Sequence, residues 1–157
     1  MLDEYSGITR TEYEQLKNAI PAITILVAGA DGTIEDHETD WAAKVTKIRS
    51  YNLPRRLSSF YKEVGKTFQE DVNHLKASFV TDPEGTKQQL KFQLATLNDV
   101  FRKLEDDELA HELYQSFLSF ARHVARSTGG VLGWGSIGPE EQEIIGLTMI
   151  HPVPPPI

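Results

Sequence analysis

The chain contains the stretch Ala30-Asp31-Gly32-Thr33-Ile34-Glu35-Asp36-His37-Glu38, which combines a turn dipeptide, a helix start and a cluster of acids. Asp31-Gly32 favours a tight turn, because glycine adopts positive φ angles without steric cost. Glu38 follows Glu35 by three residues and can accept hydrogen bonds from the backbone N–H groups exposed at the start of a helix. The stretch therefore predicts a loop that turns into a helix beginning near Glu35.

Two interpretations of these acids stay open. The spacing matches the second half of a calcium-binding loop, with Asp31 at the fifth position, Glu35 at the ninth and Glu38 at the twelfth. A valine and a glycine occupy the first and third positions, so a divalent cation (calcium, magnesium or zinc) would also need water or another acid, such as Glu141. In the other interpretation the acids only hold the corner together, with Asp31 closing the turn and Glu38 capping the helix. The candidate metal ligands are Asp31, Glu35, Glu38 and Glu141.

The composition is that of a soluble globular protein. The chain has 157 residues, of which 39% are hydrophobic and 25% charged, and this length suffices for one core. Cysteine is absent, which excludes disulfides and thiolate metal sites and fits a reducing cytoplasm. The net charge of −7 argues against nucleic acid as a partner. The N-terminus does not have the pattern of a signal peptide and no apolar run could span a bilayer, so we expect a cytoplasmic protein that does not cross a membrane.

Three long segments repeat apolar residues every three or four positions, the spacing of an amphipathic helix. The first, over 54–79, begins with a proline, which suits a first helical turn. The second, over 82–104, begins with an aspartate cap followed by a proline. The third, over 106–127, begins with two aspartates and ends before a pair of glycines. Each segment predicts one helix.

The first thirty residues favour a helix, although a proline interrupts them. Thr11 and Glu14 have the spacing of a capping box, and the apolar residues over 16–27 continue at helical spacing. Pro21 would kink such a helix. The alternative is a buried strand over 23–27, where the residues are mostly β-branched. A lone strand would leave its backbone groups without partners, which favours the helix.

Two further helices complete the pattern. One should run from Glu35 to about Ser50 and bury Trp41, Val45 and Ile48, and the last should start at the proline at 139. The sequence therefore predicts an all-α fold: a single-domain helical bundle of about six or seven helices over residues 1–150. The proline-rich tail, 151–157, should be extended, as an intramolecular strap, a dimer arm or a crystal contact.

A weak internal repeat relates the two ends of the chain. Gly32–Glu38 aligns with Gly135–Glu141, and a glycine, a hydroxyl residue, an isoleucine and the closing glutamate coincide. An apolar helix follows each copy, so the two helix-loop-helix units could pack about a pseudo-twofold axis. Asp31 is matched by Trp134, which argues against a metal site built from both copies.

These residues resemble a known family. A helix end with Ala-Asp-Gly-x-Ile-x-x-x-Glu, an amphipathic helix, and a degenerate second copy near the C-terminus are similar to the TerB family of tellurite-resistance proteins. The N-terminal domain of DjlA-type co-chaperones is similar too. The specific motif covers only Ala30–Glu38 and its echo at Ile137–Glu141. The resemblance implies a bacterial, cytoplasmic helical module of tellurite and stress resistance, which binds metal or protein partners through its acidic residues and is not an enzyme.

Basic residues follow the acids along the chain. Six cations and no acid lie between positions 44 and 62, and this basic elbow could bind an acidic or phosphorylated partner or be a solvated face. The elbow consists of Lys44, Lys47, Arg49, Arg55, Arg56 and Lys62.

We expect a non-enzymatic module that docks a protein partner through its acidic corner and the groove between the two repeats, with a homodimer as a further option. The alternative is binding or sensing of a divalent cation by Asp31, Glu35 and Glu38.

Overall fold

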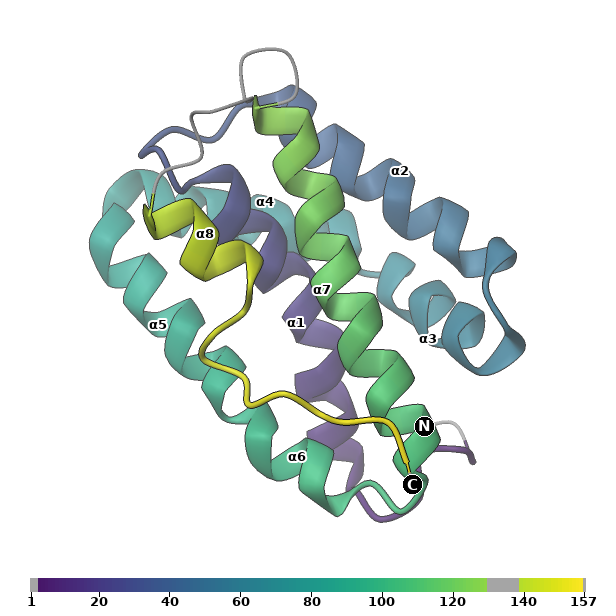
Figure 1. The fold of residues 1–157 in the computed structure, drawn as a ribbon. Coiled ribbons are helices and arrows are strands. Elements are labelled where there is room, and N and C mark those ends of the chain that lie inside the picture. The colour runs from purple at the N-terminus through teal and green to yellow at the C-terminus, as the bar shows by residue number, and fades with distance from the viewer. Residues whose placement is uncertain (1–2, 130–138, 157) are drawn as a thin grey trace.

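The computed structural model describes residues 3–129 and 139–156 (Figure 1). Every regular element in these ranges is a helix, which confirms the all-α prediction. The helices are α1 (Arg10–Ala28), α2 (Asp36–Asn52), α3 (Arg55–Gly65), α4 (Phe68–Thr81), α5 (Pro83–Ala95), α6 (Leu97–Lys103), α7 (Asp107–Gly129) and α8 (Pro139–Ile145).

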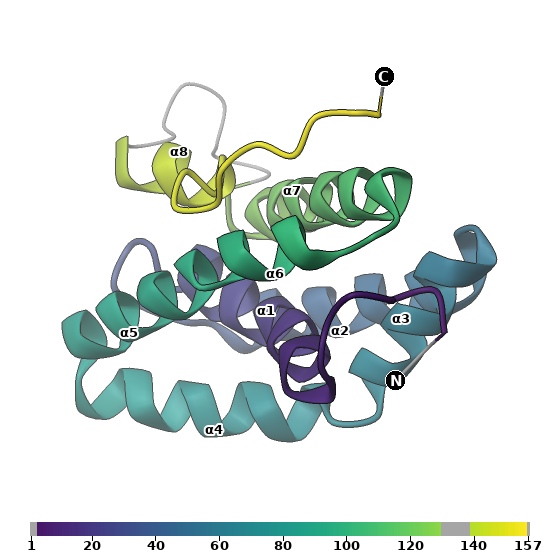
Figure 2. The ribbon, with the colours of Figure 1, turned by 90° about the horizontal axis from the view of Figure 1, so that it is seen from below.

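Helix α1 lies at the centre of the bundle. It is buried without interruption from Ala19 to Ala28 and contacts each of the other helices. In Figure 2, α4 lies on one side of α1, and α7 and α8 lie on the other. The helix continues through Pro21, so the prediction of a helix over these residues is confirmed. A helix satisfies most of its backbone groups internally, as a lone strand in this core could not.

The start of α1 lies two residues before the predicted capping box. Thr9 is the N-cap: its hydroxyl oxygen accepts from the N–H of Glu12 at 3.1 Å, and Glu12 Oε1 accepts from the N–H of Thr9 at 2.9 Å. The predicted capping box of Thr11 with Glu14 is therefore wrong. Thr9 and Glu12 have the same spacing as Thr11 and Glu14, so spacing alone did not distinguish the two pairs. The pair that forms places Ile8 and Tyr13 in the core, at the two positions of a hydrophobic staple.

Two predicted helices are interrupted. The segment 54–79 forms α3 and α4, which are separated at Lys66 and Thr67. Gly65 disfavours a helix there, and the next two N–H groups bond to carbonyls three residues back, the tighter pattern common at helix ends. The segment 82–104 likewise forms α5 and α6, which meet at Thr96. The first break lets α3 pack against α2 while α4 packs along α1.

Helix α2 turns a different face to the core than predicted. Val45 is buried, but Trp41 is 37% exposed and Ile48 is 39% exposed. The prediction failed because the buried side of this helix carries mostly polar residues, which hydrophobic periodicity does not count. The buried side consists of Glu38, Thr39, Ala42, Val45, Thr46 and Arg49.

The C-terminal tail is extended, as predicted, and lies against its own chain (Figure 1). Asn98 Nδ2 donates to the carbonyl of Met149 at 3.1 Å, and Asn98 Oδ1 accepts from the N–H of His151 at 2.7 Å. His111 Nδ1 lies 2.7 Å from the carbonyl oxygen of Val153. These contacts make the tail an intramolecular strap over α6 and α7.

The second copy of the repeat, Gly135–Glu141, lies outside the residues whose side chains the structure describes. The pseudo-twofold arrangement therefore stays a prediction. Within the described ranges, no helix is long and apolar enough to cross a membrane.

Candidate functional site

The acidic corner, residues 31–40, joins α1 to α2. Gly32 has a φ of 94°, and its N–H donates to the carbonyl of Gly29 at 2.9 Å. The N–H of Thr33 donates to Asp31 Oδ1 at 3.0 Å, so the aspartate closes the turn as predicted. Ile34 is partly buried and packs against the core. The corner is therefore fixed by its own hydrogen bonds and one apolar anchor.

Glu38 secures the start of α2 and is only 4% exposed. Its Oε1 accepts from the N–H of Glu35 at 2.8 Å, which is the predicted capping contact. Burial raises the pKa of the Glu38 carboxyl; the hydrogen bond from Glu35 lowers it in part, and the charge of Asp31 raises it further. Burial is therefore the main cause of the raised pKa, and the charges of the neighbouring carboxylates add to it.

The other acids of the corner face solvent. Glu35 Oε2 lies 3.1 Å from Nδ1 of the exposed His37. Asp36 Oδ1 lies 2.6 Å from Lys76 Nζ of α4, and this hydrogen bond lowers the pKa of the Asp36 carboxyl. The start of α2 also favours negative charge, because the positive end of the helix dipole lies there. The exposed acids are Asp31, Glu35, Asp36 and Asp40.

Of the predicted metal ligands, Asp31, Glu35 and Glu38 lie among the residues whose side chains the structure describes. Within the ranges that the structure describes, no group of three or more histidine, aspartate or glutamate side chains could hold a metal ion. Asp31 and Glu38 each accept a hydrogen bond from a backbone N–H with one carboxylate oxygen. Glu141 belongs to the residues whose side chains are not described, so its role stays a prediction. What the described corner offers is a preformed set of exposed carboxylates.

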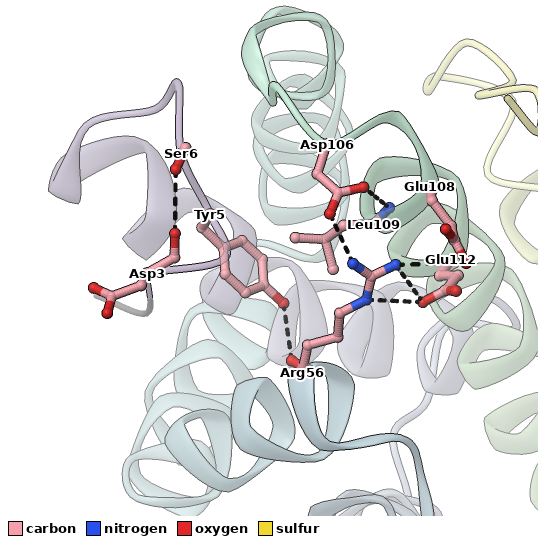
Figure 3. A network of polar contacts seen from close by, with 8 residues as sticks. All are labelled: Asp3, Tyr5, Ser6, Arg56, Asp106, Glu108, Leu109 and Glu112. Atoms are coloured by element: carbon pink, nitrogen blue, oxygen red, sulfur yellow. Dashed lines mark hydrogen bonds and ion pairs between the residues drawn. The ribbon is translucent and has the colours of Figure 1, made fainter.

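Arg56, from the basic elbow, holds the start of α7 against the start of α3 (Figure 3). Its Nη1 donates to Asp106 Oδ2 at 2.7 Å, and its Nη2 donates to Glu112 Oε2 at 3.2 Å. Asp106 Oδ1 in turn accepts from the N–H of Leu109 at 3.0 Å and so caps α7. The hydrogen bond from Leu109 lowers the pKa of the Asp106 carboxyl, and Arg56 lowers it further. The contacts of Arg56 are structural.

Arg49, also from the elbow, is buried and 7% exposed. Its Nη1 donates to the hydroxyl of Tyr61 at 3.0 Å and to the carbonyl of Ser116 at 2.7 Å, and its Nη2 donates to Ser119 Oγ at 2.7 Å. The guanidinium also lies over the rings of Tyr61 and Phe120. This network links α2, α3 and α7.

This role of Arg49 was not predicted from the sequence. Among the described residues, no carboxylate lies within ion-pair distance of its guanidinium. A buried cation without a counter-ion is costly, so its place needs the hydrogen bonds and ring contacts around it. One signal was present: Arg49 follows Ala42 by seven residues and Val45 by four, which places it on the buried stripe of α2. The six cations of the elbow therefore do not form one surface.

Comparison with known proteins adds no relative: no protein-family model matches the chain, and neither the curated proteins nor the solved structures include a match. The resemblance to TerB proteins therefore stays a prediction that rests on the corner motif.

Proposed function

We propose that this protein is a non-enzymatic binding module that docks a protein partner through its acidic corner. The proposal includes the role that the TerB resemblance implies, in stress and tellurite resistance in a bacterial cytoplasm. The supporting observation is that Asp31 and Glu38 hold the backbone of the corner while Glu35 and Asp40 face solvent. A surface that is already ordered loses little conformational entropy when a partner binds.

The partner should present a basic surface, because a negative patch attracts and orients positive charges. Such charge pairs at the rim of an interface contribute mainly to association rate and specificity, and they weaken as salt is added. A second copy of the chain is one of the partners that this proposal admits, since the basic elbow leaves Lys44, Lys47, Arg55 and Lys62 exposed.

The test uses the tagged full chain as bait in cells of its source, beside the triple variant Asp31→Asn, Glu35→Gln and Asp40→Asn. Asparagine at 31 keeps an oxygen that can accept from the N–H of Thr33, and glutamine at 35 keeps an oxygen that can accept in the capping box at the start of α2. Each rim charge contributes roughly 0.5 kcal/mol. The purified partner should therefore bind the variant about tenfold more weakly.

A matched control removes three exposed acids elsewhere, Glu70→Gln, Glu105→Gln and Asp107→Asn, and so changes the net charge equally. This control should bind the partner like the wild type. Equal loss in both triple variants would mean that net charge, and not the corner, governs binding. Unchanged binding by the corner variant would contradict the proposal.

Divalent-cation binding by Asp31, Glu35 and Glu38 is the second candidate. The observation that favours it is that the charges of Asp31 and Glu35 add to the rise that burial causes in the pKa of Glu38, and a cation would relieve this repulsion. Calorimetric titration with calcium, magnesium, zinc and manganese chlorides separates the two candidates. The docking proposal expects neither heat nor a shift in Tm at roughly millimolar metal, whereas a rise in Tm that Asp31→Asn with Glu35→Gln abolishes would favour the cation.

A further inference from the structure

A groove of about 530 Å³ lies between α2 and α7. The side formed by α2 and the residue after it is mainly apolar, and the α7 side is polar or basic. None of the described residues that line it is acidic. The apolar side includes Trp41, Val45, Ile48 and Leu53, and the α7 side consists of Gln115, Ser116, Ser119, Arg122 and His123.

Large apolar side chains are exposed along the groove side of α2. Trp41 and Ile48 line the groove and are exposed, and Tyr51, three residues after Ile48, is exposed outside the groove on the same stripe of the helix. Trp41 Nε1 donates to the carbonyl of His123 at 2.8 Å, so the indole is held at the wall of the groove. Exposed apolar stripes rimmed by polar residues mark interaction surfaces, and tryptophan is a frequent anchor there.

The charged side chains that line the groove are two arginines, Arg49 and Arg122, although the chain carries a net charge of −7. Among the described residues, the Nε–H of Arg49 has no hydrogen-bond acceptor. Burial lowers the pKa of His123, and the charges of Arg49, Arg126 and Arg122 lower it further. Arg122 and Arg126 are exposed and lie four residues apart on α7. An anionic group is the ligand that this set of cations would attract.

We propose that the groove between α2 and α7 binds an acidic amphipathic helix of a protein partner. Its apolar residues lie against Trp41 and Ile48, and its carboxylates bond to Arg49 and Arg122. A helix fits between two helices as an apolar face in a groove. The stretch from Gln115 to Arg126 is about 16 Å long at 1.5 Å per residue, which corresponds to roughly three turns of the bound helix.

This surface is opposite in charge to the acidic corner, so the inference does not rest on docking at the corner. The two surfaces have different partner chemistry: the corner attracts basic groups, whereas the groove attracts acids that are combined with apolar residues.

The test is a selection of random peptides of about 16 residues, displayed on phage, against the immobilised full chain. Enriched peptides should combine aspartate or glutamate with leucine, isoleucine or phenylalanine at spacings of three and four residues. Their synthetic versions are then measured by fluorescence anisotropy. Arg122→Glu and Ile48→Glu should each weaken binding at least tenfold, or about 1.4 kcal/mol. Absence of enrichment, or enrichment of basic or unpatterned peptides, would overturn the proposal.

The matched controls are Arg102→Glu on α6 and Val80→Glu on α4, which change an exposed cation and an exposed apolar residue outside the groove. Circular dichroism checks that all four variants fold. The controls should bind the peptide within about twofold of the wild type, and a loss equal to that of the groove variants would overturn the assignment.

Two further measurements locate the peptide and separate this proposal from docking at the corner. The ring pKa of His123, followed by NMR, should rise when peptide carboxylates enter the groove. The triple corner variant should bind the peptide like the wild type. Sedimentation of the chain alone should be unaffected by Arg122→Glu; dissociation of a self-associated form by this change would assign the groove to a second copy and overturn the proposal.

Discussion

Two buried tyrosines allow the energy of the Arg49 network to be measured with one chemical change. The hydroxyl of Tyr61 accepts from Arg49 Nη1 and donates to Ser116 Oγ, both at 3.0 Å. The hydroxyl of Tyr13 is buried and has no hydrogen-bond partner among the described residues. Replacing either residue by phenylalanine removes one oxygen and keeps the ring, which packs edge-on against Phe60 in both cases.

The two substitutions should have opposite effects on the free energy of unfolding. Tyr61→Phe removes a neutral hydrogen bond of about 1 kcal/mol and one to a cation of about 1.5–3 kcal/mol. Arg49 keeps its bonds to Ser116 and Ser119, so the cation is not left unpaired and the total loss should lie near the lower end of the sum, about 2.5–3 kcal/mol. Tyr13→Phe removes an unsatisfied polar group, and the free energy should be unchanged or rise by up to about 1 kcal/mol.

Urea denaturation followed by far-UV circular dichroism measures both effects. The m-value should be the same in the wild type and both variants, because the surface exposed on unfolding hardly changes. Tm should fall by roughly 5–10 °C for Tyr61→Phe. A loss below about 0.5 kcal/mol for Tyr61→Phe, or an equal loss for Tyr13→Phe, would refute the view that this network stabilises the packing of α2, α3 and α7.

Three other changes test the rest of the structure. Glu38→Ala should lower the free energy of unfolding by about 1 kcal/mol because it removes the cap, whereas Glu38→Gln should not, because it keeps an acceptor. The pKa of the Glu38 carboxyl in the folded protein is raised above 4.5. The free energy of unfolding of the wild type should therefore decrease as pH rises from 4.5 through the raised pKa. Thermal melts over the same pH range should show that this decrease is absent in Glu38→Gln. Gly29→Ala should cost about 1–3 kcal/mol in chemical denaturation, because its Cβ would lie 2.7 Å from the Phe79 ring, and adding Phe79→Leu should restore part of the loss. Asn98→Ala should speed hydrogen exchange at the start of the C-terminal tail, since it removes the bonds to Met149 and His151; unchanged exchange would show that these bonds do not hold the tail.

Local chemistry made the acidic corner predictable. The hydrogen bond from Thr33 to Asp31 spans two residues and that from Glu35 to Glu38 spans three, so both follow from residues adjacent in the chain. The positions of the helices followed from apolar spacing for the same reason. Where two local solutions are equivalent, as at the start of α1, the sequence did not decide between them. The core did, since it takes up Ile8 and Tyr13.

The sequence by itself determined the all-α class, the approximate extent of the helical segments, though not the breaks within two of them, and the turn and cap of the acidic corner. Only the tertiary structure decided which face of α2 is buried, because the partners of Arg49 lie 12, 67 and 70 residues away along the chain. A buried polar side chain is stabilised by groups that other segments bring to it, and hydrophobic periodicity within one helix contains no information about them. For the same reason, the groove between α2 and α7, with Trp41 exposed along it, became visible only when the two helices were seen side by side.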